Sequence, residues 1–345
     1  MKSLKPITIA GGGLAGLALG IGLRHQQIPT TVIDAGSYPR HRVCGEFICG
    51  LGHGAIERFG LDRTLAEAGA IEARTSLFQS ETAFSPVRRL PARALCVSRF
   101  ELDAALANEF KNLGGDLQEK QRWRESGFGE GIVRATGRRL KAADTDWRWF
   151  GLKVHARNVI LAADIEMHLG ENGYVGLCRL PNNEVNVCGL FRRRAQTANA
   201  PTDPRALLLG ANNRILRSRL AAAQIEDSSF CSVAGLSLEP VSARPGECCI
   251  GDALTMIPPV TGNGMSMAFE SAGLALDPLV AYCQGSILWS QAQDIIESNY
   301  RAAFSSRLRW AKWLHSFLFS RLFRIFGPSA LRSELLWRNL FRHTR

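Results

Sequence analysis

The stretch Ile7-Thr8-Ile9-Ala10-Gly11-Gly12-Gly13-Leu14-Ala15-Gly16 decides the fold of this chain. Residues 7–10 predict a short strand, and the glycines that follow match the pattern G-x-G-x-x-G. Residues 17–24 predict a helix rich in small residues, and residues 29–34 predict a second strand that ends in Asp34. A strand, a glycine turn, a helix and a strand that ends in an acid form the context in which this motif binds a dinucleotide.

Each part of this motif has a physical reason. Gly11 and Gly13 allow a tight turn and a close approach of a pyrophosphate to backbone N–H groups, and Gly16 lets the helix pack on the sheet. Asp34 can accept hydrogen bonds from ribose hydroxyls and would repel the 2′-phosphate of NADP, which favours FAD or NAD. The alternative is a glycine-rich turn that binds no ligand. The predicted cofactor-binding residues here are Gly11, Gly13, Leu14, Ala15, Gly16 and Asp34.

A second glycine-rich motif follows about 240 residues later. A strand-like run ends in Gly251-Asp252, and a loop then leads through Gly262-Asn263-Gly264 into a predicted helix over 265–280. Asp252 can accept a hydrogen bond from a sugar-alcohol hydroxyl, and the first N–H groups of the helix would point at a ligand. A surface turn is the alternative, but the first motif favours a cofactor. The predicted contacts are Gly251, Asp252, Pro259, Gly262, Asn263 and Gly264.

Other segments supply the remaining elements. Ser98 and Glu101 form a capping-box pattern at the start of a helix that ends at Gly114-Gly115. Residues 173–179 and 184–190 predict a hairpin with its turn at 181–184. Residues 201–226 look helical, and residues 235–250 look strand-like.

These pieces together resemble FAD-dependent oxidoreductases of the aromatic-hydroxylase and geranylgeranyl-reductase superfamily. The matching segments are 11–16 with Asp34, 38–46, 98–103 and 251–264, and they span residues 7–280 in the right order. The segment Tyr38-Pro39-Arg40-His41-Arg42-Val43-Cys44-Gly45-Glu46 looks most similar to the geranylgeranyl-reductase branch. The resemblance implies extended FAD, with Arg42 among its contacts and its ribityl-pyrophosphate near Arg99 and Asp252. The flavin ring would lie over the loop before the 264–280 helix.

The expected fold class is α/β, with a Rossmann-like FAD-binding domain, an inserted antiparallel β-sheet substrate domain and C-terminal helices. The FAD-binding domain is expected at 1–70, 98–138 and 235–290, the substrate domain at 71–97 and 139–234, and a basic, aromatic tail at 291–345. Hydroxylases of the superfamily usually carry a Gly-Ala-Asp-Gly stretch, whereas the counterpart here, residues 133–139, has no Asp. This departure disfavours the hydroxylase interpretation.

Two function classes stay open. The first is an FAD enzyme that transfers a hydride to a C=C bond of a lipophilic or aromatic molecule, or oxygenates it, with NAD(P)H as a candidate electron donor. The second is a flavin-binding electron-transfer or catalytically reduced partner protein. Turnover of NAD(P)H, with or without oxygen uptake, separates them.

Cys44 and Glu46 are the candidate catalytic residues, because the resemblance implies that Cys44 lines the flavin pocket; a buried packing role is the alternative. The adjacent pair Cys248-Cys249 favours packing. His53, His155 and His168 are scattered and are expected to be solvated or in the core, and no metal site is expected.

The charge is concentrated in the tail. The whole chain has a formal net charge of +11, and residues 301–345 hold ten Lys or Arg and one acid, which gives this segment +9. Aromatic residues accompany these cations over 301–326, so a peripheral contact with an anionic membrane surface is one interpretation and packing helices are the other. No nucleic-acid module accompanies the charge. A cytoplasmic protein is expected, and peripheral contact with the inner membrane surface stays open beside the packing alternative.

Overall fold

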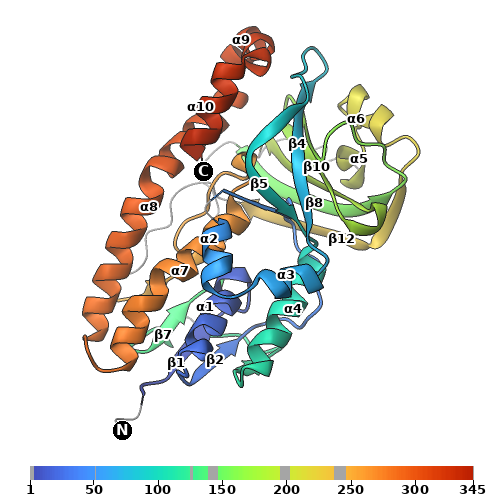
Figure 1. Ribbon diagram of the computed structural model, residues 1–345. Coiled ribbons are helices and arrows are strands. Elements are labelled where there is room, and N and C mark those ends of the chain that lie inside the picture. The colour runs from blue at the N-terminus through green and yellow to red at the C-terminus, as the bar shows by residue number, and fades with distance from the viewer. Residues whose placement is uncertain are drawn as a thin grey trace.

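The computed structural model describes residues 4–50, 52–124, 127–138, 147–194, 203–236 and 246–344, and within them the chain forms two β-sheets surrounded by helices (Figure 1). The first sheet is parallel and has the strand order β13-β7-β1-β2-β6. Its strands are β1 (Ile7–Ala10), β2 (Thr30–Ile33), β6 (Asp116–Gln118), β7 (Ile132–Arg134) and β13 (Cys248–Cys249). Because β1 is the central strand, the glycine turn lies at the carboxyl edge of the sheet, where open α/β sheets bind ligands.

Three long helices pack with this sheet: α1 (Leu14–His25), α4 (Arg99–Asn112) and α7 (Gly264–Cys283). Two glycines let α1 approach its neighbours closely. A Cβ atom at Gly20 would lie 2.9 Å from the Phe110 ring, and one at Gly22 would lie 2.6 Å from the Phe59 ring. The aliphatic and aromatic residues buried between these elements form the largest apolar core, whose removal from water is the main driving force for folding.

The second sheet is mixed and has the strand order β12-β8-β11-β10-β9-β4-β5-β3. Most neighbouring pairs are antiparallel, and β4 pairs with β9 in parallel. Its strands are β3 (Phe47–Cys49), β4 (Ile71–Ser80), β5 (Arg88–Cys96), β8 (Trp147–Arg157), β9 (Ile165–Gly170), β10 (Gly173–Arg179), β11 (Val185–Arg194) and β12 (Gln224–Leu236). The strand β3 lies within the range 1–70 but joins this sheet.

The two faces of the second sheet differ because side chains alternate along each strand. One face is apolar and packs against the short helices α5 (Arg205–Leu208) and α6 (Arg214–Arg219). The opposite face, called here the inner face, lies toward the first sheet and the C-terminal helices. Across the three strands β8, β11 and β10 it carries Trp149, Gly151, Lys153, His155, Asn186, Cys188, Leu190, Arg192, Tyr174, Gly176 and Cys178.

Three helices form the C-terminal tail: α8 (Trp289–Leu318), α9 (Arg321–Arg332) and α10 (Glu334–Thr344). The helix α8 runs beside α7, and α9 and α10 turn back at its far end (Figure 1). A buried ion pair between Arg307 and Glu270, 2.9 Å apart, joins α8 to α7. The small helix α2 (Gly52–Arg58) packs against α7, and the small helix α3 (Asp62–Glu67) packs against α4 (Figure 1). No helix in the described ranges is long and apolar enough to cross a membrane.

The predicted fold class is confirmed, and so is the hairpin, because β10 and β11 pair in antiparallel around a short turn at Pro181–Asn183. The helical prediction for 201–226 is largely wrong. That segment contains the two short helices α5 and α6 and then enters β12, because Gly210 has a φ of +83° that interrupts a helix. The strand prediction for 235–250 is also too long: β12 ends at Leu236, β13 is short, and residues 237–245 lie outside the described ranges.

Candidate functional site

The glycine turn after β1 needs glycine for its own packing as well as for a ligand. Gly11 has a φ of +113°, and a Cβ atom there would overlap the carbonyl oxygen of Ala135. A Cβ atom at Gly16 would overlap the carbonyl oxygen of Gly11. At Gly13, in contrast, a Cβ atom would meet no described atom within 4 Å. Gly11 and Gly16 therefore shape the turn, while Gly13 leaves its outer side open to a phosphate.

Asp34 lies beside this turn at the end of β2. It accepts hydrogen bonds from the backbone N–H groups of Gly12 and Gly36, each at 2.7 Å, and it pairs with Arg40 at 2.7 Å. Burial alone would raise the pKa of Asp34, but the bonds from Arg40 and the two N–H groups hold it below its usual value. Asp34 is thus a fixed carboxylate whose remaining lone pairs suit a hydroxyl donor.

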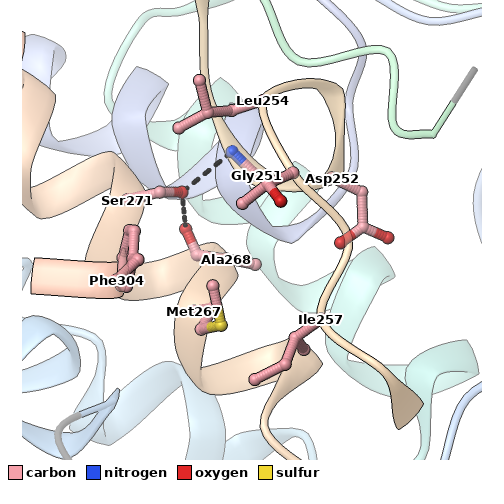
Figure 2. Close-up of a pocket in the computed structure, with 9 residues that line it drawn as sticks. Gly251, Asp252, Leu254, Ile257, Met267, Ala268, Ser271 and Phe304 are labelled. Carbon is pink, nitrogen blue, oxygen red and sulfur yellow. Dashed lines mark hydrogen bonds between the residues drawn. The ribbon is translucent and has the colours of Figure 1, made fainter. Parts of the chain in front are cut away.

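The second motif meets the first at Gly251. A Cβ atom there would lie 3.0 Å from the Ala15 side chain, and the Gly251 N–H donates to Ser271 Oγ at 2.9 Å. Figure 2 shows Asp252 on the far side of its loop, pointing away from Ser271 and Phe304. The cavity between the loop and those two residues has a volume of about 10 Å³, which suits one water molecule. A dinucleotide would lie on the Asp252 side.

Burial raises the pKa of Asp252, and the positive charges of Arg138 and Arg99 act against this rise. These cations belong to different segments of the chain. Arg99 is held by two hydrogen bonds to Asp103, at 2.7 and 2.8 Å, and Arg42 also donates to Asp103 at 3.1 Å. The fold therefore gathers fixed cations between the two glycine motifs, where the resemblance places a pyrophosphate.

The loop before α7 is held by β3. Gly262 has a φ of +65°, and a Cβ atom there would overlap the Phe47 ring. The thiol of Cys49 lies 3.3 Å from Asn263 Oδ1. At Gly264 a Cβ atom would meet no described atom within 4 Å, so the start of α7 is open on that side. Pro259, in the short turn Pro259–Thr261, completes this loop.

A buried polar cluster, called here the Glu46 cluster, lies where the first lobe meets the inner face. The Glu46 side chain is fully buried and accepts from the Arg99 N–H at 2.9 Å and from His155 Nε2 at 2.7 Å. Lys153 Nζ lies 3.4 Å from Glu46 Oε1 and donates to His41 Nδ1 at 3.0 Å. The cluster thus consists of Glu46, Lys153, His155 and His41.

The electrostatics of this cluster are unusual for a protein interior. Burial alone would raise the pKa of Glu46, but His155 and Lys153 hold it below its usual value. Burial and the Lys153 charge lower the pKa of His41 to about 4, so its ring is neutral at pH 7. Glu46 also has a φ of +59°, which is costly for a residue other than glycine. Strain of this kind is found at functional sites.

Cys44 lies next to this cluster. Its backbone carbonyl accepts a hydrogen bond from Asn186 Nδ2 at 2.9 Å, and the Glu46 N–H lies 3.5 Å from its sulfur. Burial raises the pKa of the Cys44 thiol, against the opposing charge of Arg99, so it is a protonated thiol at neutral pH. A thiol in this state can donate a proton.

The structure therefore brings together residues that the sequence separates by more than 200 positions. It also adds residues that sequence reasoning missed: Lys153 and Asn186, with His155 reassigned from an isolated core residue to a partner of Glu46. The available signal was Lys153-x-His155 within the otherwise apolar run 150–156. His168 is likewise buried and bonded to Glu166 at 3.0 Å, and Cys248-Cys249 is buried in β13.

No family model matches the chain. A menaquinone reductase of Mycolicibacterium smegmatis is 24% identical, and the match covers 97% of this chain and 90% of that protein. Among solved structures, the flavin-dependent brominase Bmp2 superposes with a TM-score of 0.76 at 15% identity, covering 98% of this chain and 92% of the brominase. A probable FAD-dependent monooxygenase of Pseudomonas aeruginosa, PqsL, superposes with a TM-score of 0.69 at 13% identity, covering 92% and 97%.

The myxobacterial chondrochloren halogenase CndH, described as a variant of FAD-dependent halogenases, has a TM-score of 0.75 at 20% identity and covers 91% of this chain and 82% of its own. The chain thus has the fold of FAD-dependent halogenases and monooxygenases, with a Rossmann-like lobe, a large second sheet and C-terminal helices. The comparisons do not single out geranylgeranyl reductases.

Proposed function

We propose that this protein is an FAD-dependent oxidoreductase that reduces a C=C bond in a lipophilic substrate of the quinone class. The observation that carries the FAD assignment is the convergence of two open glycine positions, Gly13 and Gly264, with the carboxylates Asp34 and Asp252 and the fixed cation Arg99. A menaquinone reductase that is similar over nearly the whole chain supports the choice of substrate class.

The residues present suit such a reduction. When bound, FAD supplies the hydride, which adds to one carbon of the C=C bond while the other carbon takes a proton. Cys44, protonated and placed against the inner face, is the proton donor in this proposal. Electrons come from an external two-electron donor, for which reduced nicotinamide is the first to test.

The Glu46 cluster fixes the loop that carries this thiol. His41 is partly exposed and is linked through Lys153 to the Glu46 carboxylate, and the Glu46 backbone N–H lies 3.5 Å from the Cys44 sulfur. A backbone N–H keeps its proton, so in this proposal water returns a proton to the thiol after each turnover. Glu46 holds Lys153 and His155 in place.

The cofactor assignment is tested by purifying the protein, releasing its chromophore by denaturation and identifying it by chromatography. FAD is expected. FMN alone, or no flavin after reconstitution, overturns the proposal. Turnover is then followed with NADH or NADPH and a short-chain quinone, with mass spectrometry of the product and an oxygen electrode. A gain of two hydrogens without oxygen uptake is expected. Oxygen uptake with an oxygenated product would instead favour a monooxygenase, and flavin reduction without product would favour an electron-transfer protein.

We also propose that the tail meets an anionic membrane surface. Large apolar side chains lie exposed on the tail helices and on the nearby turn between β4 and β5. They are Trp310, Trp313, Leu322, Phe326, Leu335, Leu336, Phe84 and Val87. Arg332 lies 5.5 Å from the Phe84 ring, which ties this turn to the tail. The net charge of +9 over residues 301–345 complements anionic lipids.

Sedimentation with phosphatidylglycerol-rich vesicles tests this contact. Binding is expected to fall as salt rises, because each cation near the surface contributes about 1 kcal/mol that ions screen. Leu322→Ser with Phe326→Ser is expected to weaken binding. Ile160→Ser, which alters an exposed apolar residue outside the tail, is the control. Absence of salt-sensitive binding by the unaltered protein overturns the membrane proposal.

A further inference from the structure

Two side chains at the other end of the inner face from the Glu46 cluster are buried, and their polar atoms have no hydrogen-bond partner among the described residues. Tyr174 on β10 is 6% exposed, and His315 near the end of α8 is 8% exposed. Within the described ranges, the Tyr174 hydroxyl and both ring nitrogens of His315 have no hydrogen-bond partner. Buried polar groups are almost always bonded, so three such atoms in one region require an explanation.

These two residues belong to a group of four rings and one guanidinium, called here the aromatic cluster. Its members are Trp149, Tyr174, His315, Phe319 and Arg192. The His315 ring lies 4.7 Å from Trp149 and 5.0 Å from Phe319, centre to centre. Tyr174 lies 6.4 Å from Phe319. The Arg192 guanidinium lies 4.6 Å from the Phe319 ring. Flat apolar surfaces, two side chains that can form hydrogen bonds and one cation thus lie together where the end of α8 meets the second sheet.

The aromatic cluster is continuous with the region assigned to the flavin ring. Tyr174 packs in one apolar group with Met256 and Val260, which belong to the loop that leads into α7. Along the inner face, Gly176 and Cys188 lie side by side between Tyr174 and the Asn186 that holds Cys44. A Cβ atom at Gly176 would meet described atoms only at the backbone oxygens of Cys188 and Glu166, at 3.7 and 4.0 Å.

The distance along this face suits an extended ligand. Asn186 and Leu190, which pairs with Tyr174, are four residues apart on β11, about 13 Å in a strand. A ligand with its ring at the aromatic cluster could therefore extend past the small side chains toward Cys44.

The chemistry of the cluster selects a carbonyl ring. Burial, together with the Arg192 charge, lowers the pKa of His315 to about 4, so the neutral ring offers one N–H donor. The Tyr174 hydroxyl offers a second donor. The members of the cluster include no carboxylate, so a cationic ligand is not favoured. Carbonyl oxygens on a flat ring are acceptors that suit two such donors and aromatic neighbours.

We propose that the aromatic cluster binds the carbonyl-bearing ring of a quinone-class substrate, with Tyr174 and His315 as its hydrogen-bond donors. This inference rests on the proposed function for the substrate class. It assigns these two residues to substrate binding and leaves the reacting bond near Cys44.

The experiment compares two probes of the same shape. One is 2,3-dimethyl-1,4-naphthoquinone, whose methyl groups block addition of thiols, and the other is 2,3-dimethylnaphthalene, which lacks the carbonyls. Binding to the FAD-loaded protein is followed by quenching of tryptophan fluorescence. The unaltered protein is expected to prefer the quinone. Tyr174→Phe and His315→Phe are each expected to reduce that preference about tenfold, the effect of losing one hydrogen bond.

A structural role would look different. Each variant removes a buried polar group that has no partner among the described residues. The melting temperature of the ligand-free protein is therefore expected to stay level or rise. Tyr282→Phe, which removes a hydroxyl bonded to Glu130 on another part of the chain, is the matched control and should keep the quinone preference. Unchanged preference in Tyr174→Phe and His315→Phe, or a quinone preference absent from the unaltered FAD-loaded protein, overturns the inference. If the protein takes up no FAD, the proposed function is wrong. The same titration of the flavin-free protein then still shows whether the aromatic cluster binds the quinone.

Discussion

The inner face of the second sheet has two polar ends that solve the same physical problem in opposite ways. At one end, Glu46 is fully buried and bonded to His155, Lys153 and the Arg99 backbone. At the other end, Tyr174 and His315 are almost as deeply buried, yet their polar atoms have no partner within the described ranges. A buried hydrogen-bond network in which every polar atom has a partner is stable, whereas a buried polar atom without a partner lowers stability until a ligand or water bonds to it. We infer that the Glu46 cluster is stable by itself, whereas Tyr174 and His315 gain their hydrogen bonds from a ligand.

The largest effect is expected when one partner is removed from the Glu46 cluster. Glu46→Gln would leave Lys153 buried without its counter-charge and is expected to lower the free energy of unfolding by about 3–5 kcal/mol. Urea denaturation measures this loss. Glu46→Gln combined with Lys153→Met should recover part of it. Glu67→Gln, which breaks an exposed pair with Arg63, should change the free energy of unfolding far less, because water screens an exposed ion pair. A small loss for Glu46→Gln would mean that the network contributes little to folding.

Acid acts at both ends through a histidine whose pKa is lowered to about 4, His315 at one end and His41 in the Glu46 cluster at the other. The folded-state pKa of His315 is depressed to about 4, so the unfolded chain binds its proton first, and stability is lost as pH falls from about 6.5 through 4. His315→Phe is expected to remove up to about 3 kcal/mol of that loss. Glu46, whose pKa is also lowered, loses its contribution only as pH falls below its unfolded value of 4.5. Unfolding curves at several pH values measure both slopes. An unchanged slope in His315→Phe would show that this ring is not held neutral.

The comparison extends to the ligand motifs of the first lobe, where Asp34 and Arg99 are also fixed by several bonds. Asp34→Ala and Arg99→Ala are each expected to lower the affinity for FAD by about tenfold or more, because each removes a fixed group from the proposed site. Fluorescence titration of the flavin-free protein measures this. Arg63→Ala, on an exposed side chain, is the control. If FAD affinity is unchanged in both variants, the cofactor lies elsewhere.

Cys44 lies beside the Glu46 cluster and gives the smallest expected effect. Cys44→Ala is expected to leave the FAD content unchanged and to slow turnover several-fold, because the buried thiol is the proposed proton donor. Stopped-flow measurement of flavin reduction and reoxidation checks it. Rates equal to those of the unaltered protein would make Cys44 a packing residue.

The sequence by itself determined the parts that depend on local geometry. The glycine turn at 11–16, the acid at 34 and the glycines at 251–264 could be found because a tight turn or a close backbone approach restricts the residue type at each position. From these, the α/β class and the order of the elements followed. The helix predicted over 201–226 was largely wrong because Gly210, with a positive φ, interrupts it between α5 and α6, and the chain then enters β12.

Only the tertiary structure decided which distant residues share an environment. Glu46, Lys153 and His155 form one cluster because β8 pairs in a particular register and the loop after Arg42 lies over the inner face. Tyr174 and His315, which are 141 positions apart, lie near the same ring, Phe319, because the end of α8 packs on the second sheet. Register, burial and the loss of hydrogen-bond partners are properties of packed side chains, and a linear pattern carries no information about them until the chain has folded.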